Sequence, residues 1–295
     1  MNWDRIRIFL EVARTGQFLA ASKRLKLNHA TVARQITALE SELDTKLFER
    51  RPTGSLLTTS GAALLAAAER AESALLVASS KLTATSKSLS GTVRIGAPDG
   101  LGNYFLADKL GSFAAANPAL LVQLVPLPRT FSLTKREADM AITLERPLEG
   151  RLISKKLTDY TLGVYAAKSY LRKAGEIRTR DDLKRHLFIT YVHDFMYSRA
   201  LNYSAAFDDV ATKRFECGSA VGQLEAVRAG HGVGILHDYA AQQFPTLERI
   251  LPQEQFRRSY WLVSHEDTYD VPRIRAVRTY VTAAARAERR LFVHA

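Results

Sequence analysis

Cysteine is almost absent from this chain, which has a single one, Cys217, among 295 residues. A lone cysteine excludes an intramolecular disulfide. We interpret Cys217 as a small buried hydrophobic residue, with a redox-sensing thiol as the alternative. The seven histidines are scattered, and neither H-E-x-x-H nor C-x-x-C occurs, so the sequence predicts no zinc site and no other metal site.

Long apolar runs and enzyme signatures are missing as well. Charged residues interrupt the longest apolar stretches, and the N-terminal segment alternates charge with hydrophobic side chains, which predicts neither a signal peptide nor a membrane span. No G-x-S-x-G elbow occurs, and Gly230, Gly232 and Gly234 lack the spacing of a nucleotide-binding loop, so we interpret them as a tight helix-to-strand turn. The sequence therefore predicts a cytoplasmic protein that is not an enzyme and uses no cofactor.

Acidic residues are outnumbered in the chain. It carries 42 Lys and Arg against 30 Asp and Glu, a formal net charge of +12. Residues 1–58 hold ten basic and six acidic side chains, which makes this segment about twice as basic per residue as the rest. This balance favours a polyanionic partner, and its concentration near the N-terminus favours nucleic acid.

The N-terminal residues have the pattern of three short helices. Asn2 is a good N-cap and Gly16 a good left-handed stop, which predicts a first helix over residues 3–15. An alanine-rich second helix is expected over residues 18–25. A third begins after the N-cap Asn28, with an apolar stripe on one face and polar residues on the other. Two closely joined helices of this kind are typical of a helix-turn-helix that enters the major groove; the alternative is a small helical bundle with a solvated face.

A short hairpin is predicted after the third helix. Residues 49–58 place a Pro-Thr-Gly turn between two strand-like segments. Arg50 and Arg51 beside that turn would suit a wing that contacts phosphates, although an arginine pair is also common on solvated surfaces.

The motifs of residues 18–61 closely resemble the N-terminal domain of LysR-type transcriptional regulators. They comprise A-A-S-x-x-L-x-L-N, A-R-Q-I-x-A-L-E, L-F-E-R and L-T-x-S-G at that family's spacing. The resemblance implies a winged helix-turn-helix with a recognition helix and wing that contact double-stranded promoter DNA. The expected DNA-binding residues are Asn28, His29, Thr31, Arg34, Gln35, Arg50, Arg51 and Thr53. Asn28, His29 and Ala33 depart from the family's usual residues, so operator preference is expected to differ.

Residues 59–90 form the expected linker and hinge. Leu64, Ala68, Ala71, Leu75, Ala78 and Leu82 follow each other in steps of four and three, which is typical of a coiled-coil seam. The resemblance implies a long dimerising linker helix and a dimer of dimers. The alternative is a monomeric helix that lies on its own domain.

Residues 91–295 alternate strand-like and helical segments, which predicts an α/β domain with a largely parallel sheet. The domain resembles the effector-binding domain of LysR-type regulators, which is similar in fold to periplasmic binding proteins. We expect two lobes, lobe I over about 91–160 and 266–295 and lobe II over about 161–265. A solute-binding or metabolic α/β protein with a helical dimerisation module is the alternative function.

A small-molecule effector is expected between the lobes, at the carboxyl ends of strands. Thr130 and Ser219 would donate hydrogen bonds from the two lobes, Phe131 and Tyr191 would form walls, and Asp99 would favour a cationic or amide-bearing ligand. Each position also fits a turn, cap or packing role. The expected effector-binding residues are Pro98, Asp99, Gly100, Thr130, Phe131, Tyr191, Ser219 and Val221. The predicted function is thus an effector-modulated transcriptional regulator, with RNA polymerase as a further partner.

Overall fold

The structure is a computed structural model that describes residues 2–51, 54–83, 89–130, 133, 137–148 and 150–293. Within these ranges, the side chains of residues 50, 51, 73, 76, 77 and 79–83 are outside the description. The chain divides into two compact units, which we call the helical unit and the α/β unit. The helical unit comprises Met1–Lys87, Ser132–Glu137 and Glu266–Pro272. The α/β unit comprises Ser88–Phe131, Ala138–His265 and Arg273–Ala295.

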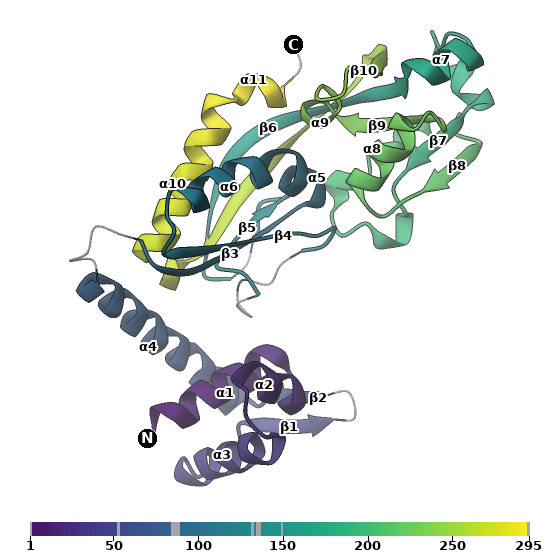
Figure 1. The fold of residues 1–295 in the computed structure, drawn as a ribbon. Helices are drawn as coiled ribbons and strands as arrows, with labels where there is room; N and C mark the ends of the chain where they lie inside the picture. The colour runs from purple at the N-terminus through teal and green to yellow at the C-terminus, as the bar shows by residue number, and fades with distance from the viewer. Residues whose placement is uncertain are drawn as a thin grey trace. The chain divides into compact units, whose positions relative to one another are not determined.

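The helical unit gathers three short helices, a hairpin and one long helix (Figure 1). Its elements are α1 (Trp3–Thr15), α2 (Phe18–Leu25), α3 (His29–Glu42), β1 (Phe48–Arg51), β2 (Gly54–Leu57) and α4 (Thr59–Thr83). Asn2 caps α1 by accepting a hydrogen bond from the Asp4 amide, and Gly16 ends that helix with φ of 66°. The predicted limits of the first two helices are therefore confirmed. Phe9, Val32 and Leu39 lie in the core that the helices share.

The hairpin is fixed to the turn between α1 and α2. Ser55 donates its amide hydrogen to the Gly16 carbonyl at 2.8 Å. Gly54 has φ of 142°, and a Cβ there would lie 2.7 Å from the same carbonyl oxygen. Only glycine allows this close approach, so the hairpin position depends on Gly54.

Helix α4 packs its first turns on its own unit. Ala68 is buried in the core, and Leu64 is partly buried against it. Arg14 of α1 donates to Glu72 of α4 at 2.5 Å, with its side chain only 9% exposed. Further along, Ala71, Leu75 and Ala78 are exposed. Leu64 and Ala68 of the predicted seam thus lie on their own unit, while Ala71, Leu75 and Ala78 face solvent in the single chain.

The α/β unit contains the remaining strands and helices. Its strands are β3 (Gly91–Ala97), β4 (Leu120–Pro126), β5 (Met140–Thr143), β6 (Leu152–Ala167), β7 (Leu187–Thr190), β8 (Lys213–Glu216), β9 (Val233–His237) and β10 (Leu247–His265). Its α-helices are α5 (Asp99–Leu101), α6 (Ala107–Ala115), α7 (Lys168–Ala174), α8 (Ala220–Arg228), α9 (Asp238–Ala241), α10 (Pro272–Ala287) and α11 (Arg289–Phe292). Glu288 leaves helical geometry and so separates α10 from α11.

The eight strands form one mixed sheet in the order β4-β3-β5-β10-β6-β9-β7-β8. Both flanks of this order are parallel, but β10 and β6 pair antiparallel with each other and with their outer neighbours. The sheet is therefore less parallel than the sequence predicted. Residues 261–264 of β10 pair with β5, so the chain has returned to the flank of β3, β4 and β5 by residue 261.

Helices cover the sheet and fix the ends of its strands. The ring centroids of Phe113 in α6 and Tyr280 in α10 lie 4.8 Å apart, and these two helices run side by side (Figure 1). Helix α8 packs against β6, β7 and β9. The carboxyl end of β3 and the start of α8 consequently meet within the α/β unit, where Gly100 lies close to Ala220.

Candidate functional site

The outer face of α3 presents the side chains expected to read DNA. Val32, Ile36 and Leu39 are buried on the inner face. Arg34 lies opposite, exposed to solvent, and makes no hydrogen bond or ion pair with the described residues. Thr31 is half-buried one turn before it. An arginine held on a helix with a free guanidinium can donate two hydrogen bonds to a guanine or bind a phosphate.

The other expected residues of α3 are partly engaged within the protein. Asn28 is exposed but caps the helix, because its side-chain oxygen accepts from the Ala30 amide at 2.9 Å. His29 is exposed with its ring 6.3 Å from that of Phe18. Gln35 accepts a hydrogen bond from Arg5 of α1 at 3.3 Å. Arg34, Thr31 and His29 are thus the expected residues of α3 whose side chains make no described hydrogen bond within the protein.

The wing hairpin has the predicted position. Arg50 pairs with Ser55 and Arg51 with Gly54 in the antiparallel ladder. The side chains of both arginines lie outside the described atoms, and so does the whole of Thr53.

Glu40 is a structural residue beside the expected DNA-binding face that the sequence analysis did not identify. Its buried carboxylate accepts hydrogen bonds from the Leu47 and Phe48 amides at 2.9 and 3.3 Å and from the Lys46 ammonium at 2.8 Å. Burial acts to raise the pKa of Glu40, but the hydrogen bonds from Lys46 and the two amides outweigh it and lower that pKa. Glu40 thereby ties the recognition helix to the strand that carries the wing arginines.

The expected effector residues meet where β3 ends and α8 begins. Asp99 is 7% exposed, and its Oδ2 accepts a hydrogen bond from the Ser219 hydroxyl at 2.6 Å. The Val221 amide points to the same oxygen at 3.5 Å. Ser219 also caps α8, accepting from the Gly222 amide. Pro98 and Gly100 are buried beside this contact. The structure therefore brings Asp99, Ser219 and Val221 together.

Two neighbouring residues of the α/β unit have buried hydroxyls without described partners, and the second of them, Tyr191, interacts with Asp99. Tyr191 is 3% exposed, and neither its hydroxyl nor that of Thr190 has a hydrogen-bond partner among the described residues. Burial, and then the negative charge of Asp99, raise the pKa of Tyr191 to about 12. The same two causes, with Tyr191 itself, raise the pKa values of Tyr197 and Tyr203. Unsatisfied buried donors are rare and commonly mark a ligand site.

Two expected effector residues are not joined to this group. Thr130 is exposed, and its carbonyl accepts from Arg129. Phe131 lies outside the described residues. Conversely, Thr190, Tyr197 and Tyr203 were not predicted, because no local motif relates them to Asp99.

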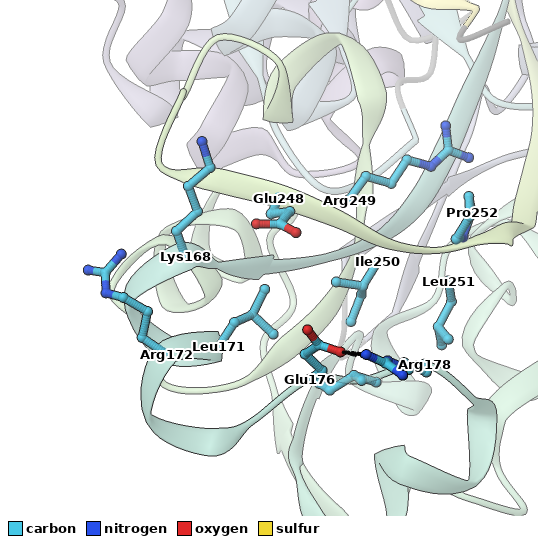
Figure 2. Close-up of a pocket in the computed structure, with 11 residues that line it drawn as sticks. Lys168, Leu171, Arg172, Glu176, Arg178, Glu248, Arg249, Ile250, Leu251 and Pro252 are labelled. Atoms are coloured by element: carbon cyan, nitrogen blue, oxygen red, sulfur yellow. Dashed lines mark hydrogen bonds and ion pairs between the residues drawn. The ribbon is translucent and has the colours of Figure 1, made fainter.

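A pocket of about 710 Å³ lies elsewhere in the α/β unit, between α7 and the start of β10 (Figure 2). Leu171, Ile250 and Leu251 contribute apolar surface to it, and Glu176 pairs with Arg178 at its rim. None of its lining residues belongs to the expected effector set.

Other kinds of site find no support in the described part of the chain. No group of three or more His, Cys, Asp or Glu side chains there is placed to hold a metal ion. Among the same residues, no helix is long and apolar enough to cross a membrane.

Comparison with known proteins identifies both units. Residues 3–62 match the family model of the bacterial regulatory helix-turn-helix protein, lysR family, and residues 86–286 match the LysR substrate binding domain. The chain is 28% identical over 302 residues to the glycine cleavage system transcriptional activator of Escherichia coli K12, across 98% of this chain and 95% of that protein.

Solved structures agree in fold. Full-length LysG from Corynebacterium glutamicum with bound effector arginine has a TM-score of 0.66 at 17% identity, covering 97% of this chain and 99% of that one. Full-length CbnR complexed with its target DNA has a TM-score of 0.55 at 20% identity, covering 97% and 100%. The chain belongs to the LysR family of DNA-binding transcriptional regulators, which are not enzymes and which carry an effector-binding domain.

Proposed function

We propose that this regulator reads promoter DNA with the outer face of α3 and grips the flanking phosphates with its wing. Arg34 carries the proposal, since it is exposed on α3 and has no partner among the described residues. Thr31, His29 and Asn28 lie at the same end of the helix, and Arg50 and Arg51 belong to the wing. Base contacts from the helix would specify the sequence, while the wing would position the protein.

We further propose that the effector binds at Asp99, Ser219, Val221 and Tyr191. The support is the Asp99–Ser219 contact, which joins residues 120 positions apart, and the unpaired Tyr191 hydroxyl beside it. Binding there changes promoter affinity only if the ligand favours one arrangement of the protein over another.

Dimerisation through α4, and pairing of dimers, belong to the same proposal. The exposed stretch with Ala71, Leu75 and Ala78 supports a helix-to-helix contact. Contact with RNA polymerase at the promoter and action in the cytoplasm follow from a role on chromosomal DNA. The proposed domain limits are 1–58, 59–90 and 91–295.

The test is footprinting on the DNA upstream of the protein's own gene across a salt series. We expect a protected site with two-fold character. The logarithm of the protein's affinity for this site should fall linearly with the logarithm of the salt concentration. Arg34→Ala should abolish that protection, while Arg275→Ala, which removes an exposed charge from α10, should preserve it. Equal protection by the two variants would show that Arg34 does not contact the DNA. Protection without sequence preference would contradict the proposal that the outer face of α3 recognises a base sequence.

A further inference from the structure

Asp99 is a buried carboxylate at the start of a helix. Its Oδ2 accepts from Ser219 and faces the Val221 amide at the N-terminus of α8, a helix of nine residues. The positive end of this helix therefore faces a carboxylate that belongs to the protein itself.

No basic side chain of the described residues pairs with this carboxylate. Asp99 forms no ion pair with any described Lys, Arg or His, and its Oδ1 makes no hydrogen bond there. His237 lies nearby, since a Cβ on Gly100 would lie 3.7 Å from its ring. Burial lowers the pKa of His237 to about 4 despite the opposing charge of Asp99, so its ring is neutral near pH 7. Buried charges in proteins are usually paired, and Asp99 is an exception.

Several tyrosines of the α/β unit interact electrostatically with Asp99. Burial first, and the charge of Asp99 in addition, raise the pKa values of Tyr104, Tyr191, Tyr197 and Tyr203. A carboxylate beside aromatic rings is a favourable environment for an organic cation.

The same geometry disfavours an anion. A helix N-terminus is ordinarily a ready binding point for a ligand's carboxylate or phosphate. Here the start of α8 is already occupied by the protein's own carboxylate, Asp99, and a second anion would be repelled.

We infer that the effector is a small organic cation whose ammonium or guanidinium group pairs with Asp99. The inference rests on the effector site proposed above and names its ligand class. Oδ1 would accept from the cation, the Tyr191 hydroxyl would bond a polar group of the same ligand, and the tyrosine rings would cover its hydrocarbon part.

The experiment measures the thermal unfolding midpoint of the full chain with matched probes. Agmatine, putrescine and choline are the cations; glutarate, benzoate and citrate are the anions. We expect at least one cation to raise the midpoint, and no anion to do so. Asp99→Asn, which keeps the volume and an acceptor oxygen, should weaken that cation's binding by about 10- to 100-fold. Asp181→Asn, which neutralises an exposed carboxylate, should bind it as the wild type does.

The other outcomes separate this inference from the proposed function. An anion that stabilises the wild type but not Tyr191→Phe would contradict the inference that the ligand is a cation, while it would still support the proposed position of the effector site. A cation that binds Asp99→Asn as well as the wild type, or the absence of any cation effect, would overturn the inference, and footprinting would still judge DNA binding. Should Asp99→Asn fail to fold, wild-type titrations with uncharged analogues of the cations decide, 1,4-butanediol for putrescine, (4-hydroxybutyl)urea for agmatine and 3,3-dimethylbutan-1-ol for choline. Affinity for the neutral analogue equal to that for its cation would exclude a Coulombic pair.

Discussion

The carboxylate of Glu40 accepts the Leu47 amide hydrogen at 2.9 Å, which joins the recognition helix to the first residues of the wing. Lys46 and Phe48 donate to the same side chain, so a single buried glutamate satisfies three donors at the junction. The relative position of α3 and the hairpin is therefore set by one residue that contacts neither base nor phosphate in any expected role.

Glu40→Ala should destabilise the helical unit by roughly 3 kcal/mol, because two backbone amides lose a charged acceptor in a buried position. Thermal unfolding with hydrogen exchange resolved over residues 2–57 measures the change. Glu42→Ala, on the same helix but exposed beside Arg5, is the control and should have little effect. If the two variants are equally stable, the Glu40 contacts do not hold the junction.

The stability that the Glu40 hydrogen bonds contribute should depend on pH. Hydrogen bonds lower the pKa of Glu40 below its ordinary value of 4.5, so the unfolded chain binds more protons near that pH. The contribution of Glu40 is then fully present above about pH 4.5 and is lost as pH falls through its folded pKa. Glu40→Gln should flatten this part of the stability profile of the helical unit, and an unchanged slope would contradict the assignment.

Leu75→Lys should weaken self-association. Leu75 is 55% exposed on the solvent-facing half of the α4 stripe, so in a coiled coil it would be buried and a lysine there would place charge in the seam. Sedimentation across a concentration series measures the assembly. Leu148→Lys, at a side chain 94% exposed outside that helix, is the control. Assembly that survives Leu75→Lys unchanged would favour the alternative in which α4 serves only its own domain.

The sequence was sufficient to predict the elements whose limits are decided by local chemistry. Asn2 and Gly16 are a cap and a stop whatever surrounds them, so the limits of α1 could be predicted. The long strands β6 and β10 were predicted only in part, because Lys156 and Arg257 look like loop residues in isolation. Lys156 pairs with Asp159 within β6, and Arg257 of β10 pairs with the same carboxylate from a strand that is distant in sequence. Their place in a sheet follows from pairing that no local pattern contains.

The candidate effector site divides in the same way. Asp99 follows a strand and Ser219 caps a helix, and both features are visible locally. Their hydrogen bond, across 120 residues, is a property of the folded α/β unit. Tyr197 and Tyr203 lie in irregular segments with no periodicity, so only the fold relates them to Asp99.

His237 should make the α/β unit sensitive to mild acid. Its side chain is 9% exposed and stacks on Tyr160, with ring centroids 5.4 Å apart. Burial lowers its pKa from 6.5 to about 4, against the opposing charges of Asp99 and Asp238. Between these two values the unfolded chain binds more protons than the folded one, so stability falls as pH falls from about 6.5 to 4. The loss of stability at the lower pH is roughly 3 kcal/mol.

His237→Phe keeps an aromatic ring against Tyr160 and should remove this dependence of stability on pH, while His231→Gln, at an exposed position, should retain it. The measurement is the unfolding midpoint of the α/β unit at a series of pH values. If the midpoints of the wild type and His237→Phe fall in parallel as pH falls, other groups cause the acid sensitivity.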